Sequence, residues 1–226
     1  MASAGESVPR FRERPTEPIV RDGWWLAAAP LAGAAAAAAA GWSAVAAVLA
    51  GLALFALLFF RNPRRAIPGD AGTVVSPADG FVAQVGEIEE PEGGKALRIG
   101  IFLSVFDVHV NRMPLAGRVL ALERGGSRYR PAFDPQAERD NVRCTLTLET
   151  ARGERFRVAQ ITGLVARRIV CHPRVGEWVE RGARYGLIRF GSRTDVVLPL
   201  RAQVKVRRGQ RVRGGSSVLA VLPEGA

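Results

Sequence analysis

The side chains that enzymes most often use as bases, nucleophiles or metal ligands are scarce in this sequence. It has two histidines, His109 and His172, and two cysteines, Cys144 and Cys171, with no CxxC or HxxxH pattern. Because a His–Cys metal site would need both pairs to converge, the sequence predicts that no metal is bound. Two cysteines also give no disulfide framework, which is typical of a domain that faces a reducing compartment.

Several familiar reaction types are disfavoured by the same scarcity. Cys171 and His172 are neighbours, and consecutive strand residues point to opposite faces, which argues against a thiol–imidazole pair. The GxSxG elbow of serine hydrolases is absent. The only lysines, Lys95 and Lys205, lie in polar strand-and-turn contexts that do not indicate a pyridoxal phosphate site. Lys205 lies in the middle of an expected strand, whereas a biotinyl or lipoyl acceptor lysine belongs at a hairpin tip.

Polar residues that could do chemistry are concentrated in three otherwise apolar segments. The segments are residues 75–80, which contain Asp79, residues 106–114, which contain His109 and Arg112, and residues 186–195, which contain Gly191 and Ser192. Each has an ordinary structural explanation, as a turn, a strand histidine and a strand end. Taken one at a time, the structural explanation is the simpler.

Taken together, the three segments resemble phosphatidylserine decarboxylases. The wording Gly-Leu-Ile-Arg-Phe-Gly-Ser-Arg at 186–193 and the stretch 160–170 look like the short-form branch, and the resemblance covers roughly residues 60–223. It implies a carboxy-lyase of phospholipid biosynthesis that converts phosphatidylserine to phosphatidylethanolamine and CO2. An archaetidylserine-type lipid is an alternative substrate, because lipid tails leave no signature in the sequence.

The resemblance also implies a zymogen that makes its own cofactor. Ser192 would attack the carbonyl of Gly191, the chain would break between them, and a covalent pyruvoyl group would form from Ser192. This group would form a Schiff base with the serine amine of the lipid and accept the electrons released with CO2. His109 is implied as the base and proton donor, with Asp79 orienting it in the manner of a catalytic triad.

Two features depart from the family pattern or compete with it. Longer members carry a second histidine three residues after the first, where this chain has Arg112. A second Gly-Ser pair ends at Ser216, but it falls within a glycine-rich turn repeat, so we assign Ser216 to a turn and the cleavage to Ser192. Cleavage there would give a large chain, 1–191, and a small chain, 192–226, that stay associated.

The charge of the chain favours an anionic partner. Lys and Arg total 32 against 21 Asp and Glu, which gives a formal net charge of +11, although a GC-rich genome also enriches arginine. No basic run is interleaved with aromatic residues, so the pattern indicates an anionic membrane lipid and no nucleic acid. The residues expected to hold the lipid phosphate are Arg112, Arg167, Arg168 and Arg193.

An apolar segment precedes the domain that must position these residues. Residues 24–60 contain no charged residue, and arginines flank them on both sides. The segment predicts two transmembrane helices of about 17 to 19 residues each, with a break at Gly41-Trp42-Ser43. Basic flanks on both sides predict that both ends, and the catalytic domain, lie on the cytoplasmic side of the inner membrane. A hairpin that dips into one leaflet is the alternative.

From Gly72 onward, short apolar runs separated by Gly, Pro and Asp are typical of β structure. A Gly-x-x-Val-x-x-Gly spacing at 176–182 recurs at 209–215, as in biotinyl and lipoyl carrier domains. The sequence therefore predicts a mostly β, barrel-sandwich-like domain behind a two-helix membrane hairpin. A non-enzymatic, membrane-anchored carrier or adaptor domain is the alternative from another class. The expected division is an N-terminal cytoplasmic arm at 1–22, the transmembrane hairpin at 23–61, a linker at 62–70 and the decarboxylase domain at 71–226.

Overall fold

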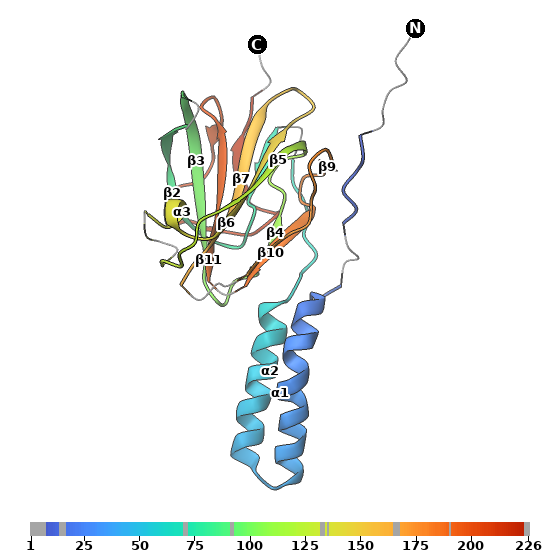
Figure 1. Cartoon of the computed structure of the whole chain (residues 1–226). Helices are drawn as coiled ribbons and strands as arrows, with labels where there is room; N and C mark the ends of the chain where they lie inside the picture. The colour runs from blue at the N-terminus through green and yellow to red at the C-terminus, as the bar shows by residue number, and fades with distance from the viewer. Residues whose placement is uncertain are drawn as a thin grey trace.

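In the computed structural model, a β-rich body lies at one end of a hairpin of two helices (Figure 1). The structure describes residues 8–13, 17–69, 72–90, 93–131, 134, 136–164, 168–189 and 191–223. The segments that enter and leave the hairpin are joined by backbone hydrogen bonds, from Val20 N to Phe60 O at 2.9 Å and from Asn62 N to Pro18 O at 2.6 Å. These bonds tie the two ends of the hairpin to each other at its base.

The hairpin consists of α1 (Arg21–Ala39) and α2 (Ser43–Phe59), which are rich in alanine and leucine, the best helix formers. The chain reverses at Gly41, whose φ of 74° is one that glycine adopts without strain. The predicted pair of helices and the break between them are confirmed.

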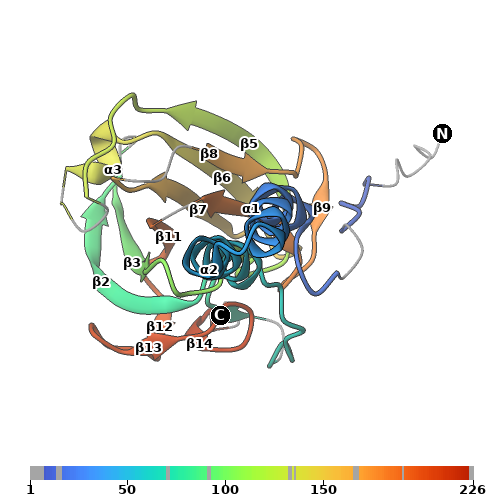
Figure 2. The same cartoon turned by 90° about the horizontal axis from the view of Figure 1, so that it is seen from below.

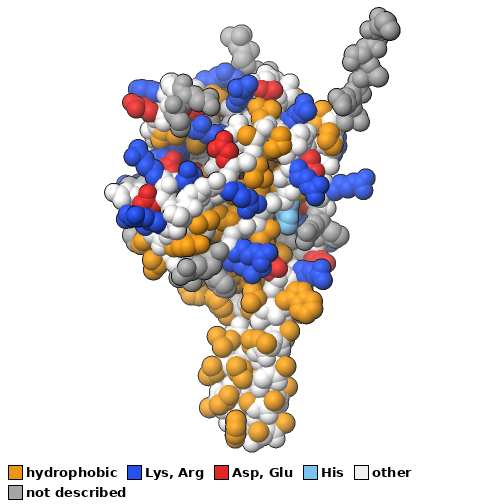
Figure 3. Space-filling model, in the orientation of Figure 1, with side chains coloured by type: hydrophobic (Ala, Val, Ile, Leu, Met, Phe, Trp, Pro, Cys, Tyr) orange, Lys and Arg blue, Asp and Glu red, His pale blue; other side chains and the backbone are white. Residues whose placement is uncertain are grey.

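The outer surface of this hairpin is apolar, as Figure 3 shows. Its exposed side chains include Trp24, Trp25, Trp42, Val48 and Leu54. Within the described residues, however, no helix is both long enough and apolar enough to cross a membrane. The structure thus shows the predicted helix pair but gives no support for two membrane spans. The 19 residues of α1 include two charged residues and are mostly alanine, and α2 has only 17 residues.

Eight strands form one antiparallel sheet that curls around the interior, in the order β13-β2-β3-β11-β7-β6-β5-β9 (Figure 2). The strands of this large sheet are β2 (Gly80–Glu89), β3 (Lys95–Leu103), β5 (Gly117–Gly125), β6 (Arg143–Glu149), β7 (Arg155–Thr162), β9 (Trp178–Val179), β11 (Ser192–Pro199) and β13 (Arg211–Val212). In β6, buried Cys144, Leu146 and Leu148 alternate with half-buried residues, the period of a strand with one face on a core.

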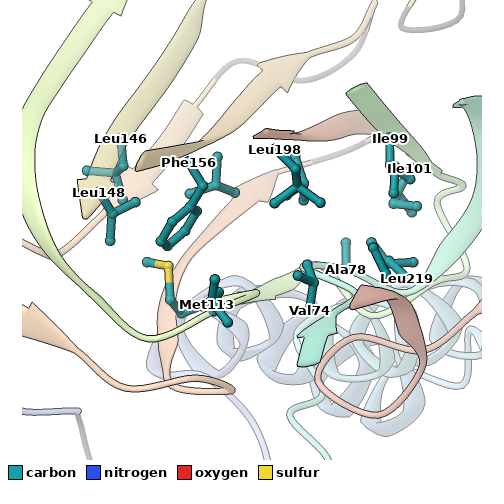
Figure 4. Close-up of a cluster of buried hydrophobic side chains, with 14 of the residues drawn as sticks. Val74, Ala78, Ile99, Ile101, Met113, Leu146, Leu148, Phe156, Leu198 and Leu219 are labelled. Carbon is teal, nitrogen blue, oxygen red and sulfur yellow. The ribbon is translucent and has the colours of Figure 1, made fainter. Parts of the chain in front are cut away.

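Two three-stranded sheets lie across the interior from the large sheet, in the orders β1-β14-β12 and β4-β10-β8. Their strands are β1 (Thr73–Val75), β4 (Val110–Arg112), β8 (Arg168–Cys171), β10 (Arg184–Arg189), β12 (Gln203–Val204) and β14 (Val218–Val221). In Figure 4, Leu146, Phe156 and Leu198 of the large sheet face Met113 and Val74 across the core. The predicted mostly β domain is confirmed, as a curled antiparallel sheet around one apolar core.

The segment before α1 is attached to the edge of the large sheet. Arg10 bridges to Trp178 of β9, and Phe11 packs against the core. Glu13 forms an ion pair with Arg184 of β10. The remaining helix, α3 (Ala137–Asp140), is a single turn before β6.

Candidate active site

Ser192 is the first residue of β11, which lies between β3 and β7 in the middle of the large sheet. It pairs with Leu103 of β3 and Thr162 of β7, so its main chain is held on both sides. The side chain is fully buried, and its Oγ has no hydrogen-bond partner among the described residues. A buried hydroxyl that forms no hydrogen bond is costly, so a purely structural role does not account for Ser192.

Gly191 lies in the turn between the two sheets, after β10 ends at Arg189 and before β11 begins. Its φ is 61°, in the left-handed region that strains residues with a Cβ. The carbonyl that Ser192 is expected to attack therefore belongs to a residue outside the strand ladder, in a conformation that glycine permits.

His109 lies just before β4 and is buried beneath the end of α2. Its ring stacks on Phe59, with ring centroids 3.9 Å apart. Its Nδ1 lies 2.9 Å from the carbonyl oxygen of Asp107. Because a carbonyl can only accept, Nδ1 carries the proton and Nε2 carries the lone pair. Nε2 is buried and has no hydrogen-bond partner in the described part of the chain.

Burial keeps the His109 ring uncharged. It lowers the pKa of His109 from 6.5 to about 4, although the Asp107 carbonyl and the Asp107 charge oppose the shift. The nearby Arg61 charge lowers this pKa further. At neutral pH, His109 is therefore a neutral imidazole with a free lone pair, which is the form a general base needs.

A buried polar layer connects the strands that carry His109 and Ser192. Asn111, two residues after His109, donates from Nδ2 to Oγ1 of Thr194 at 3.5 Å, and Gln160 donates to Asn111 Oδ1 at 2.8 Å. Alternate residues of a strand share a face, so Ser192 projects from the same face of β11 as Thr194. The fold thus brings the His109 and Ser192 segments to one buried layer.

The structure does not pair Asp79 with His109. The Asp79 carboxylate accepts hydrogen bonds from Arg65 Nη2 at 2.8 Å and from the Gly214 backbone N–H at 2.7 Å. Burial raises the pKa of Asp79, against the opposing effects of Gly214 and Arg65. The expected triad-like contact is thus replaced, since the backbone of Asp107 orients the His109 ring.

Arg193 does not have a free guanidinium for a ligand. It is buried on the other face of β11 in a two-pronged ion pair with Asp195, with Nε to Oδ1 at 2.6 Å and Nη2 to Oδ2 at 2.7 Å. Nη2 also donates to Gln84 at 3.0 Å. A Cβ at Gly100 would lie 2.9 Å from Asp195 Oδ1, so glycine leaves room for the pair. The expectation that Arg193 holds phosphate does not agree with this geometry.

The other three expected phosphate ligands are separated. Arg112 is buried and donates to two backbone carbonyls, Gly182 O at 3.1 Å and Pro63 O at 2.8 Å. Arg168 lines a cavity at the junction of the hairpin and the body. Arg167 lies outside the described residues.

Two cavities lie at this junction. One, of about 640 Å³, is lined by Arg168, Arg184 and Trp25 among others. The other, of about 730 Å³, adjoins the catalytic candidates. Its principal lining residues are Arg61, Arg64, Arg65, Asp79, Val108 and Arg213. Sequence reasoning did not single out these cavity-lining arginines, although the basic run directly after the apolar segment was the signal that could have found most of them.

Residues 52–220, which include all three polar segments, match the family model for phosphatidylserine decarboxylase. The chain belongs to the phosphatidylserine decarboxylase family. It is 50% identical over 208 residues to the phosphatidylserine decarboxylase proenzyme of Symbiobacterium thermophilum, covering 91% of this chain and 96% of the relative. It is 45% identical over 183 residues to the proenzyme of Geotalea uraniireducens, covering 80% and 86% of the two chains. A third proenzyme, from Pelobacter propionicus, is 49% identical over 177 residues, with 78% and 80% covered.

The residues at the start of β11 fit the pyruvoyl group that proenzymes of this decarboxylase family imply. Ser192 supplies a buried hydroxyl that makes no structural hydrogen bond, and Gly191 supplies the adaptable residue before it. The competing Ser216 lies in a turn, where its N–H donates to Arg213 O at 3.1 Å. The second histidine, His172, lines the cavity of about 640 Å³ and follows β8.

Proposed function

We propose that this chain is a self-processing phosphatidylserine decarboxylase of the short form, which cuts itself between Gly191 and Ser192. The observation that carries the proposal is the pair of buried atoms without hydrogen bonds, Ser192 Oγ and His109 Nε2, in two segments that the Asn111–Thr194 hydrogen bond joins. The family match supports the activity, and the coverage of 96% of one relative supports the short form.

In the processing step, His109 Nε2 accepts the Ser192 hydroxyl proton and Oγ attacks the Gly191 carbonyl carbon. The Gly191–Ser192 peptide bond breaks as an ester bond forms, and the freed nitrogen takes up a proton. Elimination then releases the Gly191 carboxylate and leaves a dehydroalanine, whose hydrolysis releases ammonia. The base is needed because an unassisted serine hydroxyl is a weak nucleophile.

The pyruvoyl group, when formed, supplies an electron sink for decarboxylation of the serine headgroup. The residues of this chain hold and serve it. The Arg193–Asp195 pair holds the residue next to Ser192, and Gln84 of the large chain accepts a hydrogen bond from Arg193. His109 holds a lone pair at Nε2 that can carry the proton needed to replace the carboxylate. The Arg65–Asp79 pair places a carboxylate at the wall of the adjoining cavity.

We propose that the hairpin is embedded in one leaflet of the inner membrane, with the β body on the cytoplasmic side. The exposed tryptophan, valine and leucine side chains of both helices support lipid contact. The charged flanks before α1 and after α2 lie at the same end of the hairpin, where it joins the body. Both chain ends are then cytoplasmic, and the arm, hairpin, linker and catalytic domain keep the bounds expected from the sequence.

After cleavage, the large and small chains are proposed to stay associated through β-ladders. β11 of the small chain pairs with β3 and β7, and β14 pairs with β1. The barrel-sandwich relation to carrier domains is a further proposal, which the positive φ of Gly182 and Gly215 at matching places in the repeat supports.

The intact mass of the purified protein tests the proposal. Two chains are expected, 1–191 and 192–226, and the smaller should be lighter than the unmodified peptide by one ammonia and blocked to Edman sequencing. Ser192→Ala should stay as one inactive chain, while Ser216→Ala should cut normally. A fragment that begins at residue 216, or cleavage of Ser192→Ala, would show the site to be wrong.

The role of His109 is tested by following self-cleavage of purified variants on gels. His109→Ala is expected to slow self-cleavage by about 10²- to 10⁴-fold, the usual contribution of a general base. His172→Ala is the matched control, because it removes the only other histidine of the sequence and should leave cleavage intact. Normal cleavage of His109→Ala would reduce His109 to a structural residue.

A further inference from the structure

The cavity of about 730 Å³ at the base of the hairpin is strongly cationic. Four arginines line it, Arg61, Arg64, Arg65 and Arg213, against one carboxylate, Asp79. Asp79 is already paired with Arg65 at 2.8 Å. The lining therefore carries a surplus of positive charge that its own carboxylate does not neutralise.

The remaining three arginines form no ion pair with any residue in the described ranges. Arg61 donates to two backbone carbonyls, Leu58 O and Phe106 O, each at 2.7 Å, which fixes its guanidinium in place. Arg64 and Arg213 are exposed, and their guanidinium groups make no hydrogen bond to described residues. Like charges gathered at one concave site favour a bound anion, and arginine suits the oxygens of phosphate in particular.

The position of the cavity relates it to the reacting residues. Val108 in its wall directly precedes His109, and Asp79 lies in the same wall. The charge of Arg61 acts on His109 and on Asp79, because it lowers the pKa of each. An anion in the cavity would thus lie next to the segment that carries His109.

The cavity also lies at the border between apolar and polar surface. Arg61 and Arg64 follow within a few residues of the end of α2 at Phe59, and the apolar hairpin surface ends there (Figure 3). Phe106, whose carbonyl binds Arg61, is 74% exposed at this border. A lipid whose tails lie along the hairpin would have its phosphate at this level.

We propose that this cavity binds the phosphodiester of the substrate lipid, with Arg64 and Arg213 as its principal ligands. The assignment rests on the proposed function, because it deepens the same site. The phosphodiester of a serine phospholipid is only a few bonds from the amine that reacts, so a phosphate held here would present that amine toward the Ser192 end of β11. Free phosphate shares this chemistry and is distinguished by the test.

The test is the double variant Arg64→Gln/Arg213→Gln, assayed on phosphatidylserine in uncharged detergent micelles. Self-cleavage and labelling of the small chain by hydroxylamine should match the wild type. The KM should rise about 10- to 100-fold with little change in kcat, as expected for the loss of charge-assisted hydrogen bonds. The matched control is Arg118→Gln/Arg155→Gln, which removes the same charge at the opposite end of the large sheet.

A KM that is unchanged, or that rises equally in the control, would overturn the assignment. Inorganic phosphate should inhibit the wild type competitively and the Arg64/Arg213 variant far less. If inhibition by phosphate is lost in the variant while its KM for the lipid is unchanged, the cavity holds free phosphate and the proposal fails. A wild-type chain that neither cuts nor decarboxylates would instead refute the proposed function, so the two failures are distinct.

Discussion

The ring of Phe59 is expected to set the pH range of self-cleavage. It stacks on His109 with centroids 3.9 Å apart and closes the end of α2 over the imidazole. Burial is the main reason that the pKa of His109 lies at about 4. Phe59→Ala would admit water to the ring and raise this pKa toward its ordinary value of 6.5.

The magnitude follows from the two limits of this pKa. The difference between a pKa of about 4 and the ordinary value of 6.5 corresponds to about 3 kcal/mol in the protonation equilibrium of His109. With a pKa of about 4, nearly all His109 is neutral at about pH 5.5, and the base is available. With the ordinary pKa, only about one-tenth would be neutral there, so cleavage would be up to about tenfold slower. Near pH 8, His109 is neutral in both the wild type and Phe59→Ala, and the cleavage rates of the two proteins should converge.

The assay is refolding of uncut chain from urea into detergent buffers between about pH 5 and pH 8, with cleavage followed on gels. Each rate is divided by the rate of the same protein at the alkaline end, which removes differences in folding yield. Phe55→Ala is the matched control, because Phe55 lies in the same helix with its ring centroid 6.1 Å from that of Phe59. Profiles of wild type and Phe59→Ala that coincide would refute the idea that burial tunes His109.

Three other results are expected. The enzyme should be active without added pyridoxal phosphate, and treatment with hydroxylamine, or with borohydride plus substrate, should abolish this activity. Full activity after the treatment would contradict a pyruvoyl cofactor. Asp195→Asn should lower the unfolding free energy of the uncut Ser192→Ala protein by about 3 to 5 kcal/mol, because it leaves Arg193 buried without its counter-charge. Glu87→Gln, at an exposed pair, should cost less than about 1 kcal/mol in the same denaturant titration. Reporter fusions should place both termini in the cytoplasm, and opposite locations would exclude the hairpin.

Local patterns were sufficient to predict the elements that carry the site. The break near Gly41 and the β texture after Gly72 depend on short-range propensity, and both appear where expected. The segments of His109 and Ser192 were found because each carries unusual residue types at close spacing, and the fold brings them to one layer.

Contacts between distant segments could not be predicted in the same way. Asp79 pairs with Arg65, in the connection after the hairpin, and no periodicity reports how that connection folds back. Arg112 is held by backbone carbonyls, which leave no trace in residue types. The Arg193–Asp195 pair was within reach, because residues two apart on a strand share a face. The lengths of the two helices, 19 and 17 residues, agree with the 17 to 19 residues expected from the uncharged run.

The central place of β11 has a consequence for refolding of the protein after the proposed cleavage at Ser192. Its ladder reaches from Ser192 to Pro199 on the β3 side, and it is flanked by β7 on the other. Before cleavage, these strands find one another within a single chain; afterwards, the same assembly would require two molecules to meet by diffusion. Recovery from denaturation should therefore depend on protein concentration in the cut form and be independent of it in the Ser192→Ala form. The proposed cleavage is therefore hard to reverse by refolding, because the correct fold has to form while the protein is still a single chain.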